Sequence, residues 1–367
     1  MKENFAKKYR PRTLNEVVEQ NQTINVLRSS LREGKVSPAY LLFGSFGTGK
    51  TTVARLLAKG LNCEQGITDS PCGVCSACVA IQDSSFFDLI EIDAASSRGI
   101  DSIRELKKLI SCVPYARYRV VVVDECHQLT KEAFNALLKT LEEPPPRTVF
   151  VLVTTDISAL PKTVVSRCQR FLFKEISIQG IKNRLKEIIQ KENIALTDGL
   201  IDTIAHFSAG SLRDALFLLE QVSFLGESAT ETEISQLAGQ PPLKKTLLLF
   251  DALLDNDASK IISSLTSLVE EGENLKRVLM NELRHFRDLL MIKVDRHGEF
   301  VQSKISIKYQ KWLESRVNKV FSTQEILEYV SAINELLPKL EHGTDMSLVI
   351  QIALISVALK NINRRKK

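Results

Sequence analysis

The sequence of 367 residues contains no continuous run of about 18 apolar residues, so no helix that crosses a membrane is expected. Its first residues, MKENFAKKYRPRT, are charged and no apolar stretch follows them, which argues against a secretory signal. It also contains no internal repeat and no low-complexity segment. These absences predict a globular protein of the cytoplasm, where thiols stay reduced, and the length predicts two or three domains.

Basic residues only slightly outnumber acidic ones. The net charge is +5, and the basic residues are unevenly distributed, because MKENFAKKYRPR carries five Lys or Arg and one Glu. Such a segment suits a phosphate-rich partner.

The first half of the sequence alternates between two patterns. Short apolar segments predict strands at residues 39–43, 86–93, 119–124, 148–155 and 170–173. Apolar residues at three- and four-residue spacing predict helices at 51–61, 100–110 and 131–143, and the PPP at 144–146 ends the last of them. Valine-rich strands separated by helices indicate an α/β fold, in which helices cover both faces of a buried parallel sheet.

Beyond Ser177 the strand pattern stops. Helical patterns run to about residue 240, QPP at 240–242 is typical of a linker, and leucines at helical spacing continue from 243 to 360. We therefore expect an α/β domain at 1–176 and helical domains at 177–240 and 243–367.

A glycine-rich loop stands between the first predicted strand and the next predicted helix. Residues 44–51 read GSFGTGKT, which fits the phosphate-binding pattern G-x-x-x-x-G-K-[ST] in the strand–loop–helix context that this pattern requires. Backbone N–H groups and the helix N-terminus favour an anion there, Lys50 can reach the outer phosphates, and the Thr51 hydroxyl can ligate Mg²⁺. The predicted nucleotide-binding residues are Gly44, Ser45, Phe46, Gly47, Thr48, Gly49, Lys50, Thr51 and Thr52.

A phosphate loop of this kind needs an acid beside the metal ion, and RVVVVDE at 119–125 supplies one. Four β-branched residues predict a fully buried strand, and Asp124 stands at its C-terminal end, where open parallel sheets bind ligands. We expect Asp124 to hold Mg²⁺ and Glu125 to polarise the water that attacks the γ-phosphate.

Cys126 and His127 follow these acids directly. Adjacent residues on a strand or tight turn point in different directions, so the two are not expected to act as nucleophile and base on one atom. Cys126 is expected to be a packing residue. His127 is either a satisfied core residue or a link from the nucleotide site to its surroundings.

Four cysteines lie within 16 residues, and no histidine is near them. Four thiolates at this spacing can converge tetrahedrally on Zn²⁺ and form a closed structural site of Cys63, Cys72, Cys75 and Cys78. A redox pair of the CxxC type and an iron–sulfur cluster are the alternatives. The remaining cysteines are expected to be small core residues, namely Cys112, Cys126 and Cys168.

In combination these motifs resemble a known family. The order along the chain is KYRPRTLNEVVEQ, GSFGTGKTT, the four-cysteine insertion, VVVVDECHQLTKEAFNALLKTLEEPPP, TTD, SRC and GSLRDAL. This set closely resembles the gamma/tau subunits of the bacterial DNA polymerase III clamp loader, which are AAA+ ATPases, over residues 5–225. The resemblance implies an AAA+ P-loop domain with a zinc module at 63–78, a helical lid domain at 177–240 and a helical collar domain for oligomerisation at 243–367.

The resemblance also implies roles for single residues. Thr155 in TTD occupies the first sensor position and Arg213 in GSLRD the second, and both would reach the γ-phosphate. Arg167 in SRC matches the arginine finger, which in this family reaches the nucleotide of the neighbouring subunit. Cations at these places stabilise the charge of the transition state.

Near the N-terminus, Tyr9, Arg10 and Pro11 resemble the segment that flanks the adenine in this family. Two nearby positions depart from the family pattern: Glu19 stands where glycine is usual, and Leu14 stands where an aromatic residue is usual. If these positions border the adenine pocket, the departures affect nucleotide affinity or base preference.

The function implied by the resemblance is that of an ATP-hydrolysing motor subunit of the clamp loader, which loads the sliding clamp onto primed DNA. The family belongs to the DNA polymerase III holoenzyme, but no polymerase active site is expected in this chain, and we expect a chain of this length to lack the long tail of the tau forms. The implied cofactors are ATP, Mg²⁺ and structural Zn²⁺. The implied partners are delta, delta-prime and further gamma/tau copies in a pentameric ring, the sliding clamp, and primed DNA through phosphate contacts.

Two other functions stay open at this point. A non-replicative AAA+ remodeller, such as an unfoldase or a branch-migration motor, usually needs aromatic pore loops, and the sequence shows no clear motif for them. A scaffold that binds nucleotide without turning it over is the second alternative, although nothing at Lys50, Asp124, Glu125 or Arg167 disables catalysis.

Overall fold

The computed structural model describes residues 4–226, 229–295, 307–317, 323–342 and 346–365. The chain forms two compact units. The first consists of Met1–Ile176 with Ala209–Phe217, and the second of Ser177–Ser208 with Leu218–Lys367. The predicted division of the chain into three domains stays a prediction.

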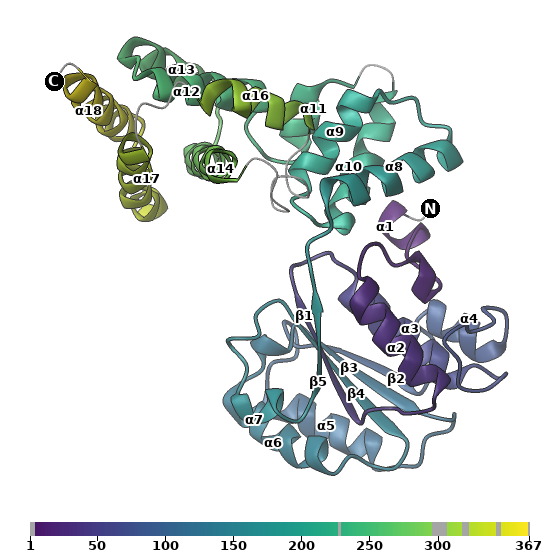
Figure 1. The fold of residues 1–367 in the computed structure, drawn as a ribbon. Helices are drawn as coiled ribbons and strands as arrows, with labels where there is room; N and C mark the ends of the chain where they lie inside the picture. Colours follow the sequence, from purple (N-terminus) through teal and green to yellow (C-terminus); the bar gives the residue numbers. More distant parts are fainter. Residues whose placement is uncertain (1–3, 227–228, 296–306, 318–322, 343–345, 366–367) are drawn as a thin grey trace. The chain divides into compact units, whose positions relative to one another are not determined.

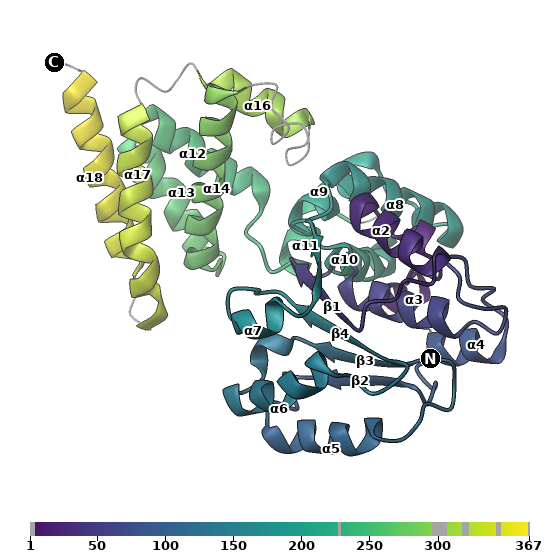
Figure 2. The ribbon, with the colours of Figure 1, turned by 60° about the horizontal axis from the view of Figure 1, so that its bottom comes forward.

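The first unit is built on a five-stranded parallel sheet with the order β2-β3-β4-β1-β5 (Figures 1 and 2). The strands are β1 (Ala39–Gly44), β2 (Leu89–Asp93), β3 (Arg119–Asp124), β4 (Thr148–Thr154) and β5 (Gln169–Phe173). The helices are α1 (Phe5–Lys8), α2 (Asn21–Arg32), α3 (Lys50–Asn62), α4 (Ser76–Gln82), α5 (Ile100–Ile110), α6 (Lys131–Glu142) and α7 (Lys162–Val165), with short 3-10 turns at Leu14–Glu16 and Cys126–Gln128. The predicted α/β fold is confirmed.

Helices cover both faces of this sheet, α2 and α3 on one side and α5 and α6 on the other (Figure 1). Along β3 the valines alternate between the two cores: Val120 and Val122 pack with α2 and α3, whereas Val121 and Val123 pack with α5 and α6. A strand buried on both faces explains the uninterrupted valine run.

Side-chain contacts stand next to the start of β2 and the start of α6. The strand predicted from residue 86 begins at Leu89, and Asp88 just before it is buried in an ion pair with Arg119, with 2.8 Å between Oδ1 and a guanidinium nitrogen. Helix α6 begins after Thr130, whose hydroxyl accepts a hydrogen bond from the N–H of Ala133 at 3.2 Å, and it ends before Pro144 as predicted.

The second unit is helical throughout its described residues. Its helices are α8 (Ile178–Glu192), α9 (Asp198–Phe207), α10 (Leu212–Leu225, which starts in the first unit), α11 (Glu231–Leu237), α12 (Leu243–Asp255), α13 (Ala258–Glu270), α14 (Leu275–Val294), α16 (Ile307–Val317), α17 (Thr323–Leu336), a 3-10 turn (Leu337–His342) and α18 (Ser347–Arg365). Helices α17 and α18 lie side by side (Figure 2). One hydrophobic cluster joins α12 through α18.

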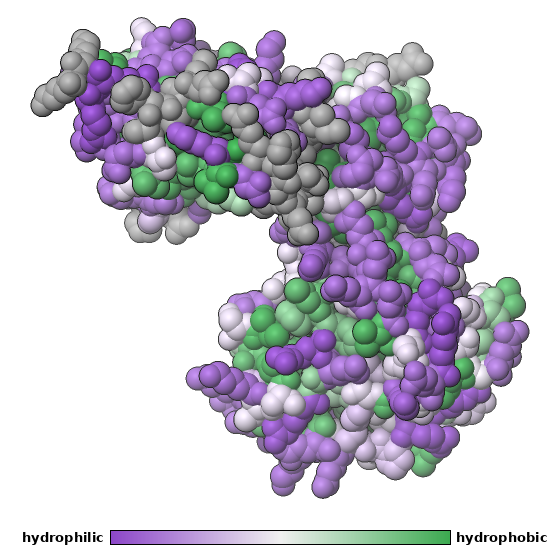
Figure 3. Space-filling model, viewed as in Figure 1, coloured by the Kyte–Doolittle hydropathy of each residue, from purple (hydrophilic) through white to green (hydrophobic). Residues whose placement is uncertain are grey.

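Polar side chains cover most of the surface that faces the viewer in Figure 3, with apolar ones scattered between them. Within the described residues, no helix combines the length and the apolar character needed to cross a bilayer.

Candidate functional site

The glycine-rich loop joins the end of β1 to the start of α3. Gly44 has a φ of +134°, and a Cβ atom added there would lie 2.0 Å from the carbonyl oxygen of Phe173. Gly47 has a φ of +70°, and its added Cβ would lie 1.9 Å from the Ser211 hydroxyl oxygen. Glycine is therefore required at both positions for conformation and for space. The Thr48 hydroxyl donates to the Ser45 carbonyl at 2.8 Å and tightens the loop.

Lys50 begins α3 and is 5% exposed. Its ammonium donates to the carbonyl oxygens of Gly44 at 2.8 Å and Ser45 at 2.7 Å, so the side chain folds back along the loop. Burial lowers the pKa of Lys50, and the carboxylates of Glu125 and Asp124 oppose that shift. The loop thus carries a cation that is held by carbonyls and can exchange them for phosphate oxygens.

The acids of β3 lie beside this loop. The Thr51 hydroxyl donates to Asp124 Oδ2 at 2.8 Å, and the backbone N–H of Glu125 donates to Asp124 Oδ1 at 3.0 Å. Strands β3, β4 and β1 are parallel neighbours, so the acids after β3 and the loop after β1 lie at the same edge of the sheet. The end of β4 lies between them. The structure therefore brings together Lys50, Thr51, Asp124 and Glu125.

Glu125 is connected to the end of β4. Its carboxylate accepts a hydrogen bond from the Thr155 hydroxyl at 3.1 Å and lies 3.4 Å from His127 Nδ1. His127 is also 3.0 Å from the Thr154 hydroxyl and 2.9 Å from the Gln128 amide nitrogen. Of the two expectations for His127, this geometry favours the link from the site to its surroundings.

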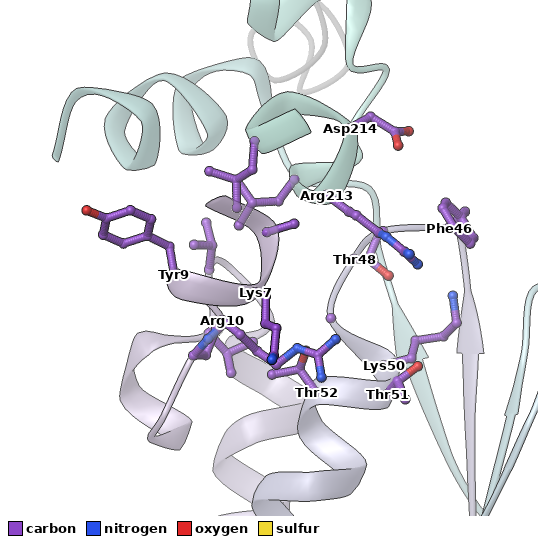
Figure 4. A pocket seen from close by; sticks show the side chains of 18 of the residues that line it. Lys7, Tyr9, Arg10, Phe46, Thr48, Lys50, Thr51, Thr52, Arg213 and Asp214 are labelled. Atoms are coloured by element: carbon purple, nitrogen blue, oxygen red, sulfur yellow. The ribbon is translucent and has the colours of Figure 1, made fainter. Parts of the chain in front are cut away.

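A cavity of about 780 Å³ opens over the loop (Figure 4). Its lining includes the predicted residues Tyr9, Arg10, Pro11, Phe46, Gly47, Thr48, Gly49, Lys50, Thr51, Thr52, Asp124, Glu125 and Arg213. The Arg213 guanidinium stacks over the Phe46 ring, 5.4 Å from its centroid, whereas the Tyr9 ring turns away from Lys50 in Figure 4. A volume in this range suits a small-molecule ligand.

Four predicted site residues do not line this cavity. Gly44 and Ser45 contribute carbonyl oxygens to Lys50, and the Thr155 hydroxyl donates a hydrogen bond to Glu125. Arg167 lies elsewhere, where it forms an ion pair with Glu142 and donates to the Thr163 carbonyl at 2.7 Å.

The two departures from the family pattern, Leu14 and Glu19, do not line the cavity. In this segment the lining residues are Val17 and Val18. Leu14 is 3% exposed and packs in the core between the sheet and helices α2 and α3. Glu19 has a φ of 62°, a left-handed conformation that glycine adopts without strain. The departure at Glu19 therefore concerns the backbone.

Several lining residues were not predicted, among them Val17, Val18, Arg55, Ser84 and Phe217. Arg55 stands four residues after Thr51 on α3, so helical spacing alone places both on one face. No comparable signal in the sequence marks Ser84, which reaches the cavity only through the tertiary fold.

The four cysteines of the insertion converge. The sulfurs of Cys63, Cys72, Cys75 and Cys78 all lie within 4.8 Å of one another, and those of Cys72 and Cys78 are 4.0 Å apart. Four thiolates around one Zn²⁺ at a Zn–S distance of about 2.3 Å would be about 3.8 Å apart, so the cluster fits a single tetrahedral ion. Hydrogen bonds from the backbone N–H groups of Val74 and Cys75 lower the pKa of Cys72 to about 6, which favours the thiolate that a metal needs.

The three remaining cysteines divide. Cys126 and Cys168 are buried, as predicted, and burial raises the pKa of both thiols. The prediction for Cys112 is wrong, because this residue is exposed. Cys112 lies in the loop after α5. Its backbone carbonyl oxygen accepts a hydrogen bond from Arg119 at 2.9 Å.

Comparison with known proteins adds a second line of observation. A family model described as DNA polymerase III, delta subunit, matches residues 19–177, and one described as DNA polymerase III clamp loader subunit, ATPase lid domain, matches residues 180–227. The DNA polymerase III subunit gamma of Buchnera aphidicola (subsp. Acyrthosiphon pisum) is 36% identical over 96% of this chain and 99% of its own length.

The DNA polymerase III subunit tau of Bacillus subtilis is 34% identical over 95% of this chain. The chain spans 62% of that relative's length. Among solved structures, the RuvB Holliday junction branch migration motor of Thermotoga maritima aligns with a TM-score of 0.49 and 17% identity, over 74% of this chain and 91% of that one.

Proposed function

Since the chain belongs to the family of DNA polymerase III gamma and tau subunits, we propose that it is an ATP-hydrolysing subunit of a clamp loader that places a sliding clamp on primed DNA. The observation that carries this proposal is the contact of 2.8 Å between the Thr51 hydroxyl and Asp124, with Lys50 and Glu125 beside it. Loop hydroxyl, loop lysine and strand-end acids are the parts that P-loop nucleotide hydrolysis needs.

In this proposal the loop N–H groups and Lys50 bind the phosphates of ATP, and residues 9–11 lie beside the adenine. Thr51 and Asp124 hold Mg²⁺, which neutralises charge on the phosphate oxygens. Lys50 leaves the carbonyls of Gly44 and Ser45 when it turns to the outer phosphates. Both contacts with neutral carbonyls are weaker than those with a charged phosphate, so the exchange favours nucleotide binding.

Glu125 takes the proton from the attacking water in the proposed reaction. Its present partner, the Thr155 hydroxyl, stands at the first sensor position and orients either the carboxylate or the water. Arg213 reaches the phosphates from α10. Its stacking on Phe46 already holds the guanidinium at the cavity.

Arg167 acts in another way in this proposal. It is paired with Glu142 and lies outside the lining of the chain's own cavity, which is compatible with a finger that reaches the nucleotide of an adjacent subunit. Hydrolysis then depends on assembly, because the transition-state charge in each site needs the neighbour's arginine. In related nucleotide hydrolases such a finger contributes roughly 10³–10⁵ in rate.

For the cysteine cluster we propose structural Zn²⁺ over the two alternatives. An iron–sulfur cluster binds its thiolates through several irons and needs them further apart than one ion does. A redox pair does not explain why four sulfurs meet within 4.8 Å. The metal fastens the insertion between α3 and α4 and has no part in hydrolysis.

The remaining parts of the proposal concern assembly. The helices from 177 to 240 form a lid and those from 243 to 367 a collar, and the chain joins delta, delta-prime and further gamma/tau copies in a pentameric ring in the cytoplasm. Primed DNA is bound through its phosphates.

The test is the ATP turnover of the assembled complex with clamp and primed DNA added singly and together. We expect turnover to rise only when both are present. A branch-migration motor or an unfoldase would respond to DNA junctions or protein substrates instead, and a nucleotide-binding scaffold would show no turnover under any condition.

A further inference from the structure

A second cavity of about 270 Å³ lies in the first unit, between the N-terminal segment, the outer face of α3 and the end of α4. Half of its twelve lining residues are basic: Lys7, Lys8, Arg10, Arg12, Arg55 and Lys59. Among the described residues that line it, Asp83 is the one acid. A concave site with this excess of positive charge focuses an anion-attracting field.

Lys59 is the most informative of these residues because it is only 3% exposed. Its ammonium has two hydrogen-bond partners in the described structure, the Arg12 carbonyl and the Gln82 side-chain oxygen, both at 3.4 Å and both neutral. No carboxylate of the described residues forms an ion pair with it. A buried ammonium with long, uncharged contacts is costly, and an anion between the same walls would offset that cost.

The arginines of this cavity fall into two groups. The charge of Arg55 is neutralised by Glu91, because two guanidinium nitrogens donate hydrogen bonds to its carboxylate oxygens at 2.7 and 2.5 Å. Arg10 and Arg12 have no ion-pair partner among the described residues, and burial followed by the nearby charge of Arg55 lowers the pKa of Arg10. Two guanidinium groups without carboxylate partners provide paired N–H donors for an oxyanion.

We propose that this cavity is a second anion site, which binds a phosphate group beside the nucleotide. Phosphate is favoured over a carboxylate because its double charge and several oxygens suit Lys59, Arg10 and Arg12 together. The volume of about 270 Å³ admits a phosphate or pyrophosphate but no folded segment of a partner.

The phosphate has two possible sources, which share this chemistry. The cavity has Lys7, Arg10, Pro11, Thr52 and Arg55 in common with the nucleotide cavity. A nucleotide in the first cavity can therefore place an additional ribose phosphate in the second. Alternatively, free phosphate or pyrophosphate enters alone and shares Lys7 and Arg10 with the nucleotide. Each ligand then lowers the affinity of the protein for the other by the same factor.

The first experiment isolates the second cavity. Inorganic phosphate is titrated calorimetrically, at constant ionic strength, into full-length Lys50→Ala protein, which lacks the loop's phosphate ligand. We expect saturable binding that Arg12→Gln in the same background weakens about tenfold, the loss of one charged hydrogen-bond donor. Lys108→Gln, which removes an exposed lysine of α5, should leave binding unchanged.

The second experiment separates the sources in the unsubstituted protein. If the phosphate is free, its binding persists with saturating ADP and lowers the affinity for ADP. If it is carried by the nucleotide, adenosine 3′-phosphate 5′-diphosphate binds more tightly than ADP and Arg12→Gln removes the difference. Equal effects of Arg12→Gln and Lys108→Gln, or no saturable binding of any of these ligands outside the loop, would overturn the proposal.

Discussion

The imidazole of His127 lies with Nδ1 3.0 Å from the hydroxyl of Thr154, so the turn after β3 is tied to the end of β4. The neighbouring contacts decide the tautomer. The Thr154 hydroxyl donates to the Asp156 carbonyl at 3.0 Å, and the Gln128 amide nitrogen, a donor, is 2.9 Å from His127 Nε2. Nδ1 therefore carries the proton, and it points to Thr154 and, at 3.4 Å, to the carboxylate of Glu125.

This donor makes His127 a positioning residue for Glu125. We expect His127→Ala to lower kcat of the assembled ATPase about tenfold or more, while KM for ATP stays the same, because a carboxylate that loses its lateral contact no longer meets the water correctly. His127→Asn, whose amide N–H can replace Nδ1–H, should recover most of the rate. If Ala and Asn variants have the same kcat, His127 has only a packing role.

Removal of the charge on Glu125 is expected to stop ATP hydrolysis and to leave ATP binding largely unchanged. Glu125→Gln should reduce ATP turnover at least about 100-fold, since the amide cannot accept the proton of the attacking water. Binding of a fluorescent ATP analogue should remain within a factor of about two or three of the unsubstituted protein. Glu132→Gln, an exposed acid on α6, serves as the control and should not change turnover.

Stability should increase when Glu19 becomes glycine. Glu19 is held at a φ of 62°, which costs a residue with a Cβ atom about 1–2 kcal/mol. Glycine avoids this strain but loses about 0.5–1 kcal/mol through the freedom of the unfolded chain. The expected net gain of Glu19→Gly is about 0.5–1 kcal/mol in thermal or urea unfolding. Glu19→Ala keeps the strained backbone, so an equal gain from Ala would assign the effect to the side chain.

The cysteine cluster predicts bound metal in a stoichiometric amount. Protein purified under reducing conditions should contain about one zinc per chain, because four thiolates at these distances bind one tetrahedral ion. Cys78→Ser should lose the metal and unfold at a lower temperature, whereas Cys112→Ser, exposed and outside the cluster, should retain both properties. Iron in place of zinc, or no metal at all, would contradict the assignment.

A buried acid in the second unit makes a prediction about pH. Glu282 on α14 is fully buried, and neither of its carboxylate oxygens has a hydrogen-bond partner among the described residues. Burial raises the pKa of Glu282 well above 4.5, so the folded protein binds this proton more tightly than the unfolded chain does. The resulting penalty is absent below pH 4.5 and grows as the pH rises toward the folded pKa.

Replacement of Glu282 by methionine should therefore raise the unfolding temperature at pH 8 and do so progressively less toward pH 5. Glu282→Gln also removes the ionisation but keeps a buried polar group, so its gain should be smaller at every pH and should fall in the same way toward pH 5. Unfolding of all three proteins by calorimetry across this pH range measures the difference. A gain for methionine that is constant with pH would show that Glu282 is not the titrating group.

Local patterns were sufficient for the framework of the first unit. Helix α5 begins and ends where the spacing of Ile103, Leu106 and Ile110 predicts, and β3 coincides with the valine run. Helices α2 and α4 were not predicted, although Ile24, Leu27 and Leu31 have helical spacing. The phosphate loop and the cysteine spacing could be recognised because their chemistry is confined to a few consecutive residues.

The sequence by itself determined the five strands and the helices α3, α5 and α6 of the first unit, where the phosphate loop and the acids stand, and which four cysteines can share an ion. Only the tertiary structure decided the strand order, the core position of Leu14, the exposure of Cys112 and the second cavity, where Lys59 meets the backbone of a residue 47 positions earlier. The reason is physical. Periodicity records which face of one element is buried, but contacts between distant residues depend on how all the elements pack together.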